Sequence, residues 1–186
     1  MIASLISYQE VVFLVPENAR SGERLQEEVL ASALPEGDFF IGVGDNRIRR
    51  AYFERLRGHG AKMPPCVAPN AWIAPDAVMG EGVFIGPGAV VAAGCRIGDA
   101  VIVNTLASID HDCEVGPDTQ LTPGVTLGSR LVIGRSCYFG MKSCILPGLT
   151  LGDDVTVMAG ALVVRAAPSG VMLGGVPARV MRLSSG

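Results

Sequence analysis

The sequence is poor in aromatic residues, long apolar runs and excess basic charge, and each shortage excludes a class of protein. Aromatic side chains make up only 5% of the 186 residues, whereas 49% are hydrophobic and 24 are glycine. The apolar content is therefore small and aliphatic, which suits thin, stacked layers better than a thick globular core. No run of about 18 apolar residues occurs, so we expect no transmembrane helix. The net charge of −3, without a basic stripe, argues against a nucleic-acid partner.

The first residues and the cysteines indicate a cytoplasmic protein with reduced thiols. The segment Met1–Leu5 is not a basic leader followed by an apolar block and a small-residue cleavage site, so we expect no secretory signal. The cysteines match no zinc or redox spacing, and their number is odd. They are Cys66, Cys95, Cys113, Cys137 and Cys144. We interpret them as structural thiols in a reducing compartment.

The strongest pattern is a six-residue repeat that begins at Val67. Every sixth residue from Val67 to Val163 is large and apolar, and the register never slips. These seventeen residues are Val67, Ile73, Met79, Ile85, Val91, Ile97, Val103, Ile109, Val115, Leu121, Leu127, Ile133, Phe139, Ile145, Leu151, Val157 and Val163. The position four residues further on is mostly small, and Cys95, Cys113 and Cys137 occupy it as small hydrophobic residues.

This period predicts a parallel β-helix. Positions i and i+4 lie on the same side of a strand, and the next inward residue at i+6 requires a corner between them. Three such sides close a triangular coil of about 18 residues, which stacks on the next coil at the strand spacing of about 4.8 Å. The run allows a little over five coils. A helix with its period of 3.6 residues and a transmembrane barrel with strict alternation do not fit this pattern.

Glycine often follows the large apolar residue of the repeat. The glycines at this position are Gly80, Gly86, Gly98, Gly116, Gly128, Gly134, Gly140 and Gly152. We expect them to form the corners, where the chain needs either an unusual φ or a close approach of two backbone segments.

The first third of the chain does not repeat and predicts a small α/β unit. The expected elements are strands at Glu10–Val15 and Phe39–Val43, and helices at Gly22–Leu34 and from Gly44 to about Arg57. The order strand, helix, strand, helix implies a truncated, Rossmann-like unit with a parallel sheet. We therefore assign residues 1–62 to this unit and residues 63–186 to the β-helix, with Ala61–Pro65 as the connection.

The turn before the second helix is a candidate site for a nucleotide sugar. Gly44 and Asp45 stand where a strand meets a helix, and a helix N-terminus can hold a phosphate. The Gly-x-Gly sequence at Gly42 is not a full dinucleotide fingerprint, and an ordinary strand–helix turn is an equally open interpretation. Asp45 or Asn46 is the expected N-cap of the helix.

The faces of this second helix follow from its sequence. Ile48, Tyr52 and Leu56 are expected on its apolar face. Its basic residues, Arg47, Arg49 and Arg50, are expected to form a solvent-exposed face rather than a binding patch.

Only two histidines exist, and one of them is a candidate catalytic base. His59 falls at the expected end of the second helix, where it can interact with the helix dipole. His111 follows Ile109 by two residues, so the repeat places it at a corner, between Asp110 and Asp112. A group that removes a proton from a substrate needs a pKa near neutrality, and a neighbouring carboxylate can orient the imidazole. A surface histidine without function is the alternative.

Three motifs resemble one family of enzymes. They are Asn104-Thr105 with Ile109-Asp110-His111-Asp112-Cys113, then Pro123-Gly124-Val125, and the ending Gly174-Gly175-Val176-Pro177-Ala178-Arg179-Val180. Together they are similar to the sialic-acid O-acetyltransferase and nucleotide-amino-sugar N-acetyltransferase family of hexapeptide-repeat proteins, over about residues 39–182. The resemblance implies a left-handed β-helix and a homotrimer, with acyl-CoA in a groove between neighbouring prisms.

The resemblance also implies roles for individual residues. His111 would be the general base, with Asp112 as its acidic partner, and Asn104 would lie beside the acceptor sugar. Ser129 would offer a backbone N–H to the thioester oxygen, which stabilises a developing oxyanion. The remaining residues implied in acetyl-CoA binding are Met141, Ala159, Gly160 and Arg179.

Two features depart from the family pattern. Gln120 stands where the family often has a second histidine, so one contact to the acceptor is expected to differ. Family members also carry a Gly-Gly-His-Gly type turn after the first strand, and this sequence begins after that point. We therefore expect either an incomplete nucleotide pocket or a different acceptor.

The sequence thus predicts an acetyltransferase that uses acetyl-CoA and no metal to acetylate the amino group of a nucleotide-linked 4-amino-deoxy sugar. The resemblance places this reaction in glycan or lipopolysaccharide precursor synthesis. An O-acetyltransferase acting on a sialic-acid-like sugar and a non-catalytic β-helix scaffold are the alternatives. A zinc site like that of the related γ-class carbonic anhydrases would need about three His or Cys ligands, and His111 is the only histidine at a corner.

Overall fold

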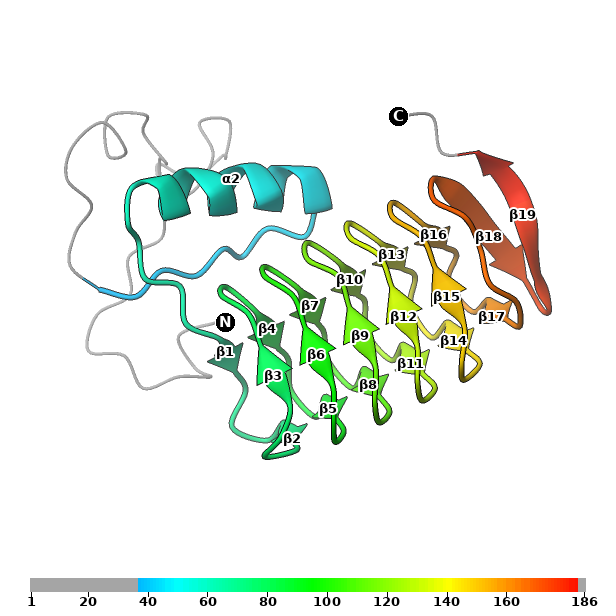
Figure 1. Ribbon diagram of the computed structural model, residues 1–186, viewed down its shortest axis with the longest axis horizontal. Coiled ribbons are helices and arrows are strands. Elements are labelled where there is room, and N and C mark those ends of the chain that lie inside the picture. The colour runs from blue at the N-terminus through cyan, green and yellow to red at the C-terminus, as the bar shows by residue number, and fades with distance from the viewer. Residues whose placement is uncertain (1–36, 184–186) are drawn as a thin grey trace.

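The computed structural model describes residues 37–183 of the chain. Over this range, the helix α2 (Asn46–Gly58) is followed by a long stack of short strands and a C-terminal hairpin (Figure 1). The predicted strand at Glu10–Val15 and helix at Gly22–Leu34 lie outside the described residues.

The strands of the stack begin with β1 (Cys66–Val67) and end with β17 (Leu162–Val163), and each has two residues. Between these lie β2 (Trp72–Ile73), β3 (Val78–Met79), β4 (Phe84–Ile85), β5 (Val90–Val91), β6 (Arg96–Ile97), β7 (Ile102–Val103), β8 (Ser108–Ile109), β9 (Glu114–Val115), β10 (Gln120–Leu121), β11 (Thr126–Leu127), β12 (Val132–Ile133), β13 (Tyr138–Phe139), β14 (Cys144–Ile145), β15 (Thr150–Leu151) and β16 (Thr156–Val157). The second residue of every strand is one of the seventeen predicted apolar residues, which confirms the repeat and its register.

Parallel pairing joins each strand to the one 18 residues further on, so the predicted coil length is confirmed. Cys66 pairs with Phe84, for example, and Gln120 pairs with Tyr138. The first sheet has the order β1-β4-β7-β10-β13-β16-β18-β19, the second β17-β14-β11-β8-β5-β2, and the third β15-β12-β9-β6-β3. The chain passes from the first sheet to the second, then to the third and back to the first. We call the three edges of the prism the first–second, second–third and third–first corners.

The core of the prism consists of the two inward positions of the repeat. Ile85, Ile109 and Leu121 are fully buried, whereas the first coil, at the end of the stack, is only half-buried. The cysteines at the small position lie inside this core, as predicted. Burial raises the pKa of Cys113 to about 11 and that of Cys137 to about 12, so neither thiol is a nucleophile at neutral pH.

The glycines after the large residue serve close backbone approach rather than unusual φ. A Cβ atom on Gly86 would lie 2.8 Å from the backbone nitrogen of Thr105 in the next coil. Positive φ falls instead three residues after the large residue, at every sixth position from Gly82 to Gly160. Eight of these positions are not glycine, including Leu106 and Asp112 with φ of 57° and 59°. The corner geometry therefore imposes this conformation on whatever residue stands there.

Helix α2 lies along one side of the stack, at the third–first corner (Figure 1). Asp45 is its N-cap, as predicted, and its carboxylate accepts a hydrogen bond of 2.9 Å from the Ile48 N–H. The buried face consists of Arg49, Phe53 and Leu56, while Ile48 is exposed, so the predicted apolar face is shifted. The prediction that Arg49 is exposed is wrong, because its guanidinium bonds to carbonyl groups of the prism.

The predicted second strand, Phe39–Val43, is not a strand in the structure. A single bridge joins Asp38 to Lys62, and the Phe39 N–H donates to the Lys62 carbonyl at 2.8 Å. The segment instead packs its side chains on the prism and α2: Ile41 is buried, and Phe40 contacts Phe84 with ring centroids 5.4 Å apart. An apolar run is extended here without a ladder, so the predicted α/β unit is not confirmed.

The C-terminal hairpin closes the first sheet. Strand β18 (Val171–Gly175) pairs in parallel with β16 and antiparallel with β19 (Ala178–Leu183). Within the described range, no helix has the length and apolar character needed to cross a membrane.

Candidate active site

His111 and Asp112 form a close pair at the second–third corner. The imidazole Nδ1 lies 2.8 Å from Oδ2 of Asp112, and the His111 side chain is 45% exposed. The backbone N–H of His111 donates to Oδ1 of Asp110 at 2.8 Å. A carboxylate on Nδ1 keeps the proton on that nitrogen, which leaves Nε2 with a free lone pair. The corner therefore presents a histidine that can accept a proton.

The β-helix fixes the position of the Asp112 carboxylate. Asp112 stands at the positive-φ position of the repeat, which aspartate tolerates better than most residues. Its N–H donates to the carbonyl of Ala93 in the preceding coil at 2.9 Å. The pair with His111 thus follows from the corner geometry and not from a mobile loop.

Ser129 lies on the same corner, one coil further on. The N–H of Arg130 donates to the His111 carbonyl at 2.9 Å, so this segment lies directly against the histidine. Ser129 is buried, and its backbone N–H has no acceptor among the described residues. The structure therefore brings together His111, Asp112 and a backbone N–H that is unpaired among the described residues.

A second group of predicted residues lies at the first–second corner. Asn104 is half-buried there, and its Oδ1 accepts a hydrogen bond of 2.7 Å from the Thr105 N–H. Met141 and Ala159 are exposed, and the N–H of Gly160 donates to the Met141 carbonyl at 2.8 Å. The whole second sheet separates this corner from His111 within one chain.

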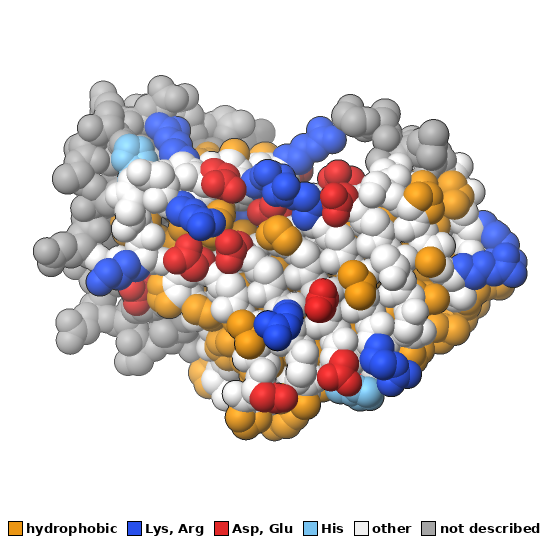
Figure 2. Space-filling view, in the orientation of Figure 1, with side chains coloured by type: hydrophobic (Ala, Val, Ile, Leu, Met, Phe, Trp, Pro, Cys, Tyr) orange, Lys and Arg blue, Asp and Glu red, His pale blue; other side chains and the backbone are white. Residues whose placement is uncertain are grey.

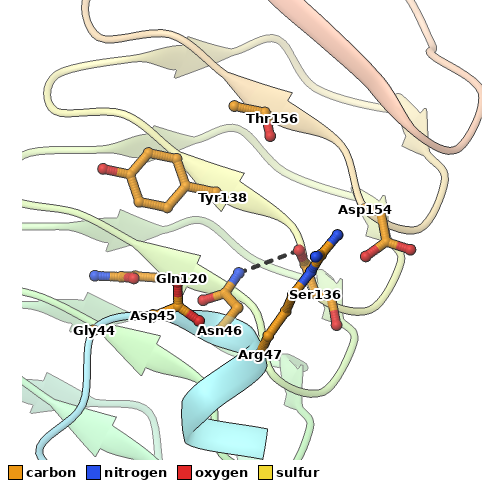
Figure 3. Close-up of a pocket in the computed structure, with 9 residues that line it drawn as sticks. All are labelled: Gly44, Asp45, Asn46, Arg47, Gln120, Ser136, Tyr138, Asp154 and Thr156. Carbon is orange, nitrogen blue, oxygen red and sulfur yellow. Dashed lines mark hydrogen bonds between the residues drawn. The ribbon is translucent and has the colours of Figure 1, made fainter. Parts of the chain in front are cut away.

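A third group surrounds a cavity of about 580 Å³ beside the N-terminus of α2 (Figure 3). Its lining residues are Gly44, Asp45, Asn46, Arg47, Gln120, Ser136, Tyr138, Asp154 and Thr156. The predicted residues Gly44, Asp45 and Gln120 therefore meet here. The Asn46 amide donates to the Ser136 and Cys137 carbonyls at 3.1 and 3.0 Å, which attaches the start of α2 to the prism.

Among the cavity residues that the β-helix contributes, four were not predicted, although the repeat contains the signal for them. Tyr138 and Thr156 stand 18 and 36 residues after Gln120, so they share its outward position on the first sheet. Ser136 and Asp154 are 18 residues apart on the third–first corner. Stepping by one coil from Gln120 and from one corner residue would have found both pairs.

The buried Arg49 side chain links the turn before α2, which forms part of the cavity wall, to the prism. Its guanidinium donates to the carbonyls of Val43 and Gly44 at 3.2 and 3.1 Å, and to those of Ala100 and Asp118 at 2.8 and 2.6 Å. Burial lowers the pKa of Arg49 to about 10, against the opposing effect of Asp118, so it remains charged at neutral pH. This buried cation joins the Val43–Gly44 turn to two coils of the prism.

The other charged groups are more dispersed. Arg179 is exposed on β19 and donates to the Ala178 carbonyl at 3.1 Å. On the face shown in Figure 2, basic and acidic side chains are interspersed near α2. Among residues 37–183, no group of three or more His, Cys, Asp or Glu side chains is arranged to hold a metal ion.

Comparison with known families supports the repeat. Residues 76–106 match the family model described as bacterial transferase hexapeptide (six repeats), and residues 130–165 match the hexapeptide repeat of succinyl-transferase. The GDP-perosamine N-acetyltransferase of Escherichia coli O157:H7 is 26% identical over 152 residues, which cover 78% of this chain and 68% of that protein.

Two solved structures are more similar. The acetyltransferase domain of PglB from Neisseria gonorrhoeae FA1090 is 34% identical with a TM-score of 0.90, covering 97% of this chain and 93% of that domain. The same domain has also been solved in complex with acetyl coenzyme A. PerB from Caulobacter crescentus, in complex with CoA and GDP-perosamine, is 36% identical with a TM-score of 0.76, covering 77% of this chain and 69% of PerB.

The fold and these similarities define a hexapeptide-repeat acyltransferase. Since the PglB domain is 34% identical over nearly its whole length, the chain belongs to the hexapeptide-repeat sugar N-acetyltransferases.

Proposed function

We propose that this protein transfers the acetyl group of acetyl-CoA to the amino group of a nucleotide-linked 4-amino-deoxy sugar, with His111 as the general base. The observation that carries this proposal is the His111–Asp112 pair, 2.8 Å apart at an exposed corner. The relatives with CoA, acetyl coenzyme A and GDP-perosamine bound support the two substrates. The expected role is in glycan precursor synthesis in the cytoplasm.

The reaction proceeds by direct attack on the thioester. Nε2 of His111 takes a proton from the acceptor amine as the amine nitrogen bonds to the thioester carbonyl carbon. The negative charge that develops on the carbonyl oxygen is stabilised by the Ser129 N–H. The tetrahedral intermediate then breaks its C–S bond, and the departing CoA thiolate takes the proton from His111. No acyl-enzyme forms, because Cys113, the thiol nearest to His111 in sequence, is fully buried with a raised pKa.

The complete site requires more than one copy of the chain. Asn104, Met141 and Ala159 lie at the first–second corner, whereas His111 and Ser129 lie at the second–third corner. A rigid prism cannot bring these two corners together. A closed ring of three copies solves this, because the second–third corner of one copy then faces the first–second corner of the next. This homotrimer places acetyl-CoA, with Gly160 and Arg179 among its contacts, in the groove between two prisms.

Release of the CoA thiol from acetyl-CoA tests this function. The acceptor panel comprises UDP-, GDP- and dTDP-linked 4-amino sugars and free sialic acids. We expect turnover with an amino sugar and a loss of at least roughly 100-fold in His111→Ala. His59→Ala is the matched control, since His59 is exposed at the end of α2 and should leave the rate unchanged.

The panel also separates the alternatives. Turnover with a sialic acid alone would establish an O-acetyltransferase and contradict the amine acceptor. A folded protein that does not bind acetyl-CoA would be a scaffold, and full activity of His111→Ala would exclude His111 as the base.

A further inference from the structure

Leu106 is an exposed apolar residue in a backbone conformation that disfavours it. It lies at the first–second corner, in the turn between β7 and β8 (Figure 1), where it is 68% exposed and has a φ of 57°. This conformation is unfavourable for a residue with a Cβ, because the Cβ comes close to the following carbonyl oxygen. The same position of this corner is occupied in other coils by Gly88, Gly124, Lys142 and Gly160. Strained residues cluster at functional sites, so Leu106 is a candidate for a role in function.

The Leu106 side chain fills space that the preceding coil leaves open. A Cβ atom on Gly88 would lie 2.7 Å from Cδ2 of Leu106, so the leucine lies over that glycine. The Leu106 N–H donates to the Pro87 carbonyl at 2.9 Å, which holds the backbone against the same coil. On the following coil, Gly124 has no side chain, and a Cβ there would meet only the stem of Lys142, at 3.3 Å. The surface of this corner is therefore open at Gly124 and closed at Leu106.

In the proposed ring of three copies, Leu106 of one copy is level with the His111–Asp112 pair of the next. The corners are straight, so two of them face each other over several coils only if the prisms are parallel, and each coil then has the same height in every copy. Leu106 and Asp112 occupy the same position of the repeat, six residues apart in one coil. Each leans on a glycine of the preceding coil, Leu106 on Gly88 and Asp112 on Gly94. The leucine of one copy therefore faces the base of its neighbour.

The order of residues along the groove places Leu106 at the acyl end of the bound CoA. The predicted acetyl-CoA residues of this corner, Met141 and Ala159, lie two and three coils beyond Leu106 toward the C-terminus. The expected oxyanion donor, Ser129, lies one coil beyond the base. A CoA arm that enters from the C-terminal end brings its thioester to the level of Ser129, opposite the open part of the corner. The acyl chain beyond the thioester then extends toward Leu106.

We propose that Leu106 of the neighbouring copy limits the acyl donor to acetyl-CoA. Its side chain closes the groove one coil past the thioester, so the methyl group of an acetyl fits against it, whereas a propionyl or butyryl chain collides with it. The contact between two apolar groups removes both from water, which offsets the unfavourable φ. This inference rests on the proposed function and its ring of three copies, and deepens it by naming the residue that selects the acyl group.

The test compares acyl donors of increasing length. Release of the CoA thiol gives kcat/KM for acetyl-, propionyl- and butyryl-CoA, with GDP-perosamine or a UDP-linked 4-amino sugar, whichever wild type turns over. One excess methylene in a closed apolar site costs about tenfold, so wild type should have a propionyl-to-acetyl ratio of kcat/KM of about 0.1 or less. In Leu106→Gly, this ratio should rise about tenfold. Glycine adopts a φ of 57° without strain, so the variant should fold.

Lys142→Gly is the matched control. Lys142 stands at the same position of the same corner two coils further on, with the same φ of 57°, so the change to the backbone is equivalent. Its propionyl-to-acetyl ratio should equal that of wild type. An equal rise in both variants would show that a loosened corner, rather than the leucine side chain, sets the ratio, and would overturn the inference.

Mixed trimers test whether the leucine acts across the interface. Tagged Leu106→Gly copies are assembled with a large excess of untagged His111→Ala copies, so that most isolated trimers contain one tagged copy. The single intact base lies in the tagged copy, but the leucine that faces it belongs to a neighbour and is intact. The propionyl-to-acetyl ratio should therefore return to the wild-type value. A ratio as high as that of Leu106→Gly alone would place leucine and base of one site in the same chain, contrary to the inference.

The remaining outcomes separate this inference from the proposed function. Turnover of an amino sugar with the same acyl ratio in wild type and Leu106→Gly would overturn the inference and leave the proposed function standing. The same conclusion would follow if wild type used butyryl-CoA as well as acetyl-CoA, or if Leu106→Gly raised only the KM of the amino sugar, which would assign the leucine to the acceptor. Absence of turnover with every acyl-CoA in wild type would overturn both.

Discussion

Two inactive variants should restore activity when they assemble together. His111→Ala removes the base at the second–third corner, and Ala159→Trp fills the groove at the first–second corner, where residue 159 is exposed. Each variant should lose at least roughly 100-fold in turnover when it is alone. If each site takes His111 from one copy and Ala159 from the next, a mixed ring contains one site in which both halves are intact.

The magnitude follows from the ring. A trimer with two copies of one variant and one of the other has three interfaces, and only one joins an intact His111 to an intact Ala159. Mixed trimers, isolated through a different affinity tag on each variant, should therefore have about one third of the wild-type rate per chain.

The assay is the release of the CoA thiol at saturating substrate concentrations. The controls are trimers that contain only one variant, isolated through the same two affinity tags. Mixed trimers that remain as inactive as the single variants would refute the arrangement of corners, because a site completed within one chain cannot be restored by mixing. A monomer or dimer in light scattering would refute it independently.

Three further predictions concern the fold that carries the site. Arg49→Met should lower the free energy of unfolding by about 3 kcal/mol or more, because the carbonyls of Ala100 and Asp118 lose buried, charge-assisted hydrogen bonds. In urea unfolding, the exposed control Arg47→Met should differ from wild type by less than about 0.5 kcal/mol. Equal effects of the two variants would contradict the role of Arg49. Ser143→Ala should stabilise the protein by about 1 kcal/mol, because the buried Ser143 hydroxyl is unpaired. Thr119→Val should destabilise the protein, because the Thr119 hydroxyl donates to the Gly134 carbonyl and accepts from the Cys137 N–H. The free energy of unfolding should fall as pH rises above about 9, because the thiols of Cys113 and Cys137 ionise there in the unfolded chain but not in the folded protein, where their pKa values are about 11 and 12. Cys113→Ala should reduce this fall by up to about 1.4 kcal/mol per pH unit. An unchanged slope of unfolding free energy against pH in this variant would contradict the prediction.

The β-helix could be predicted from the sequence because its contacts are periodic. Each residue of the stack packs against residues 18 positions away, so the same environment recurs every coil and selects the same residue type. Ile85, Ile109 and Leu127 are large for that one reason, and the corner that carries His111 follows from counting two residues past Ile109. The pairing of His111 with Asp112 needed only this local geometry.

The segment before the β-helix could not be predicted in the same way. Phe39–Val43 has the composition of a strand, but a strand requires a partner, and only the tertiary structure shows that its side chains pack on the prism instead. Arg49 looks like a surface residue in the sequence, because nothing local reveals the carbonyls of Ala100 and Asp118 that surround it.

The sequence by itself therefore determined the repeat, its register, the buried cysteines and the corner position of His111, because a repeated local pattern specifies each of them. Only the tertiary structure decided that Gln120 and Tyr138 share a cavity with the N-terminus of α2, and that Arg49 lies buried against the carbonyls of Ala100 and Asp118. These features depend on which distant segment lies against each coil, and the six-residue repeat does not specify that contact.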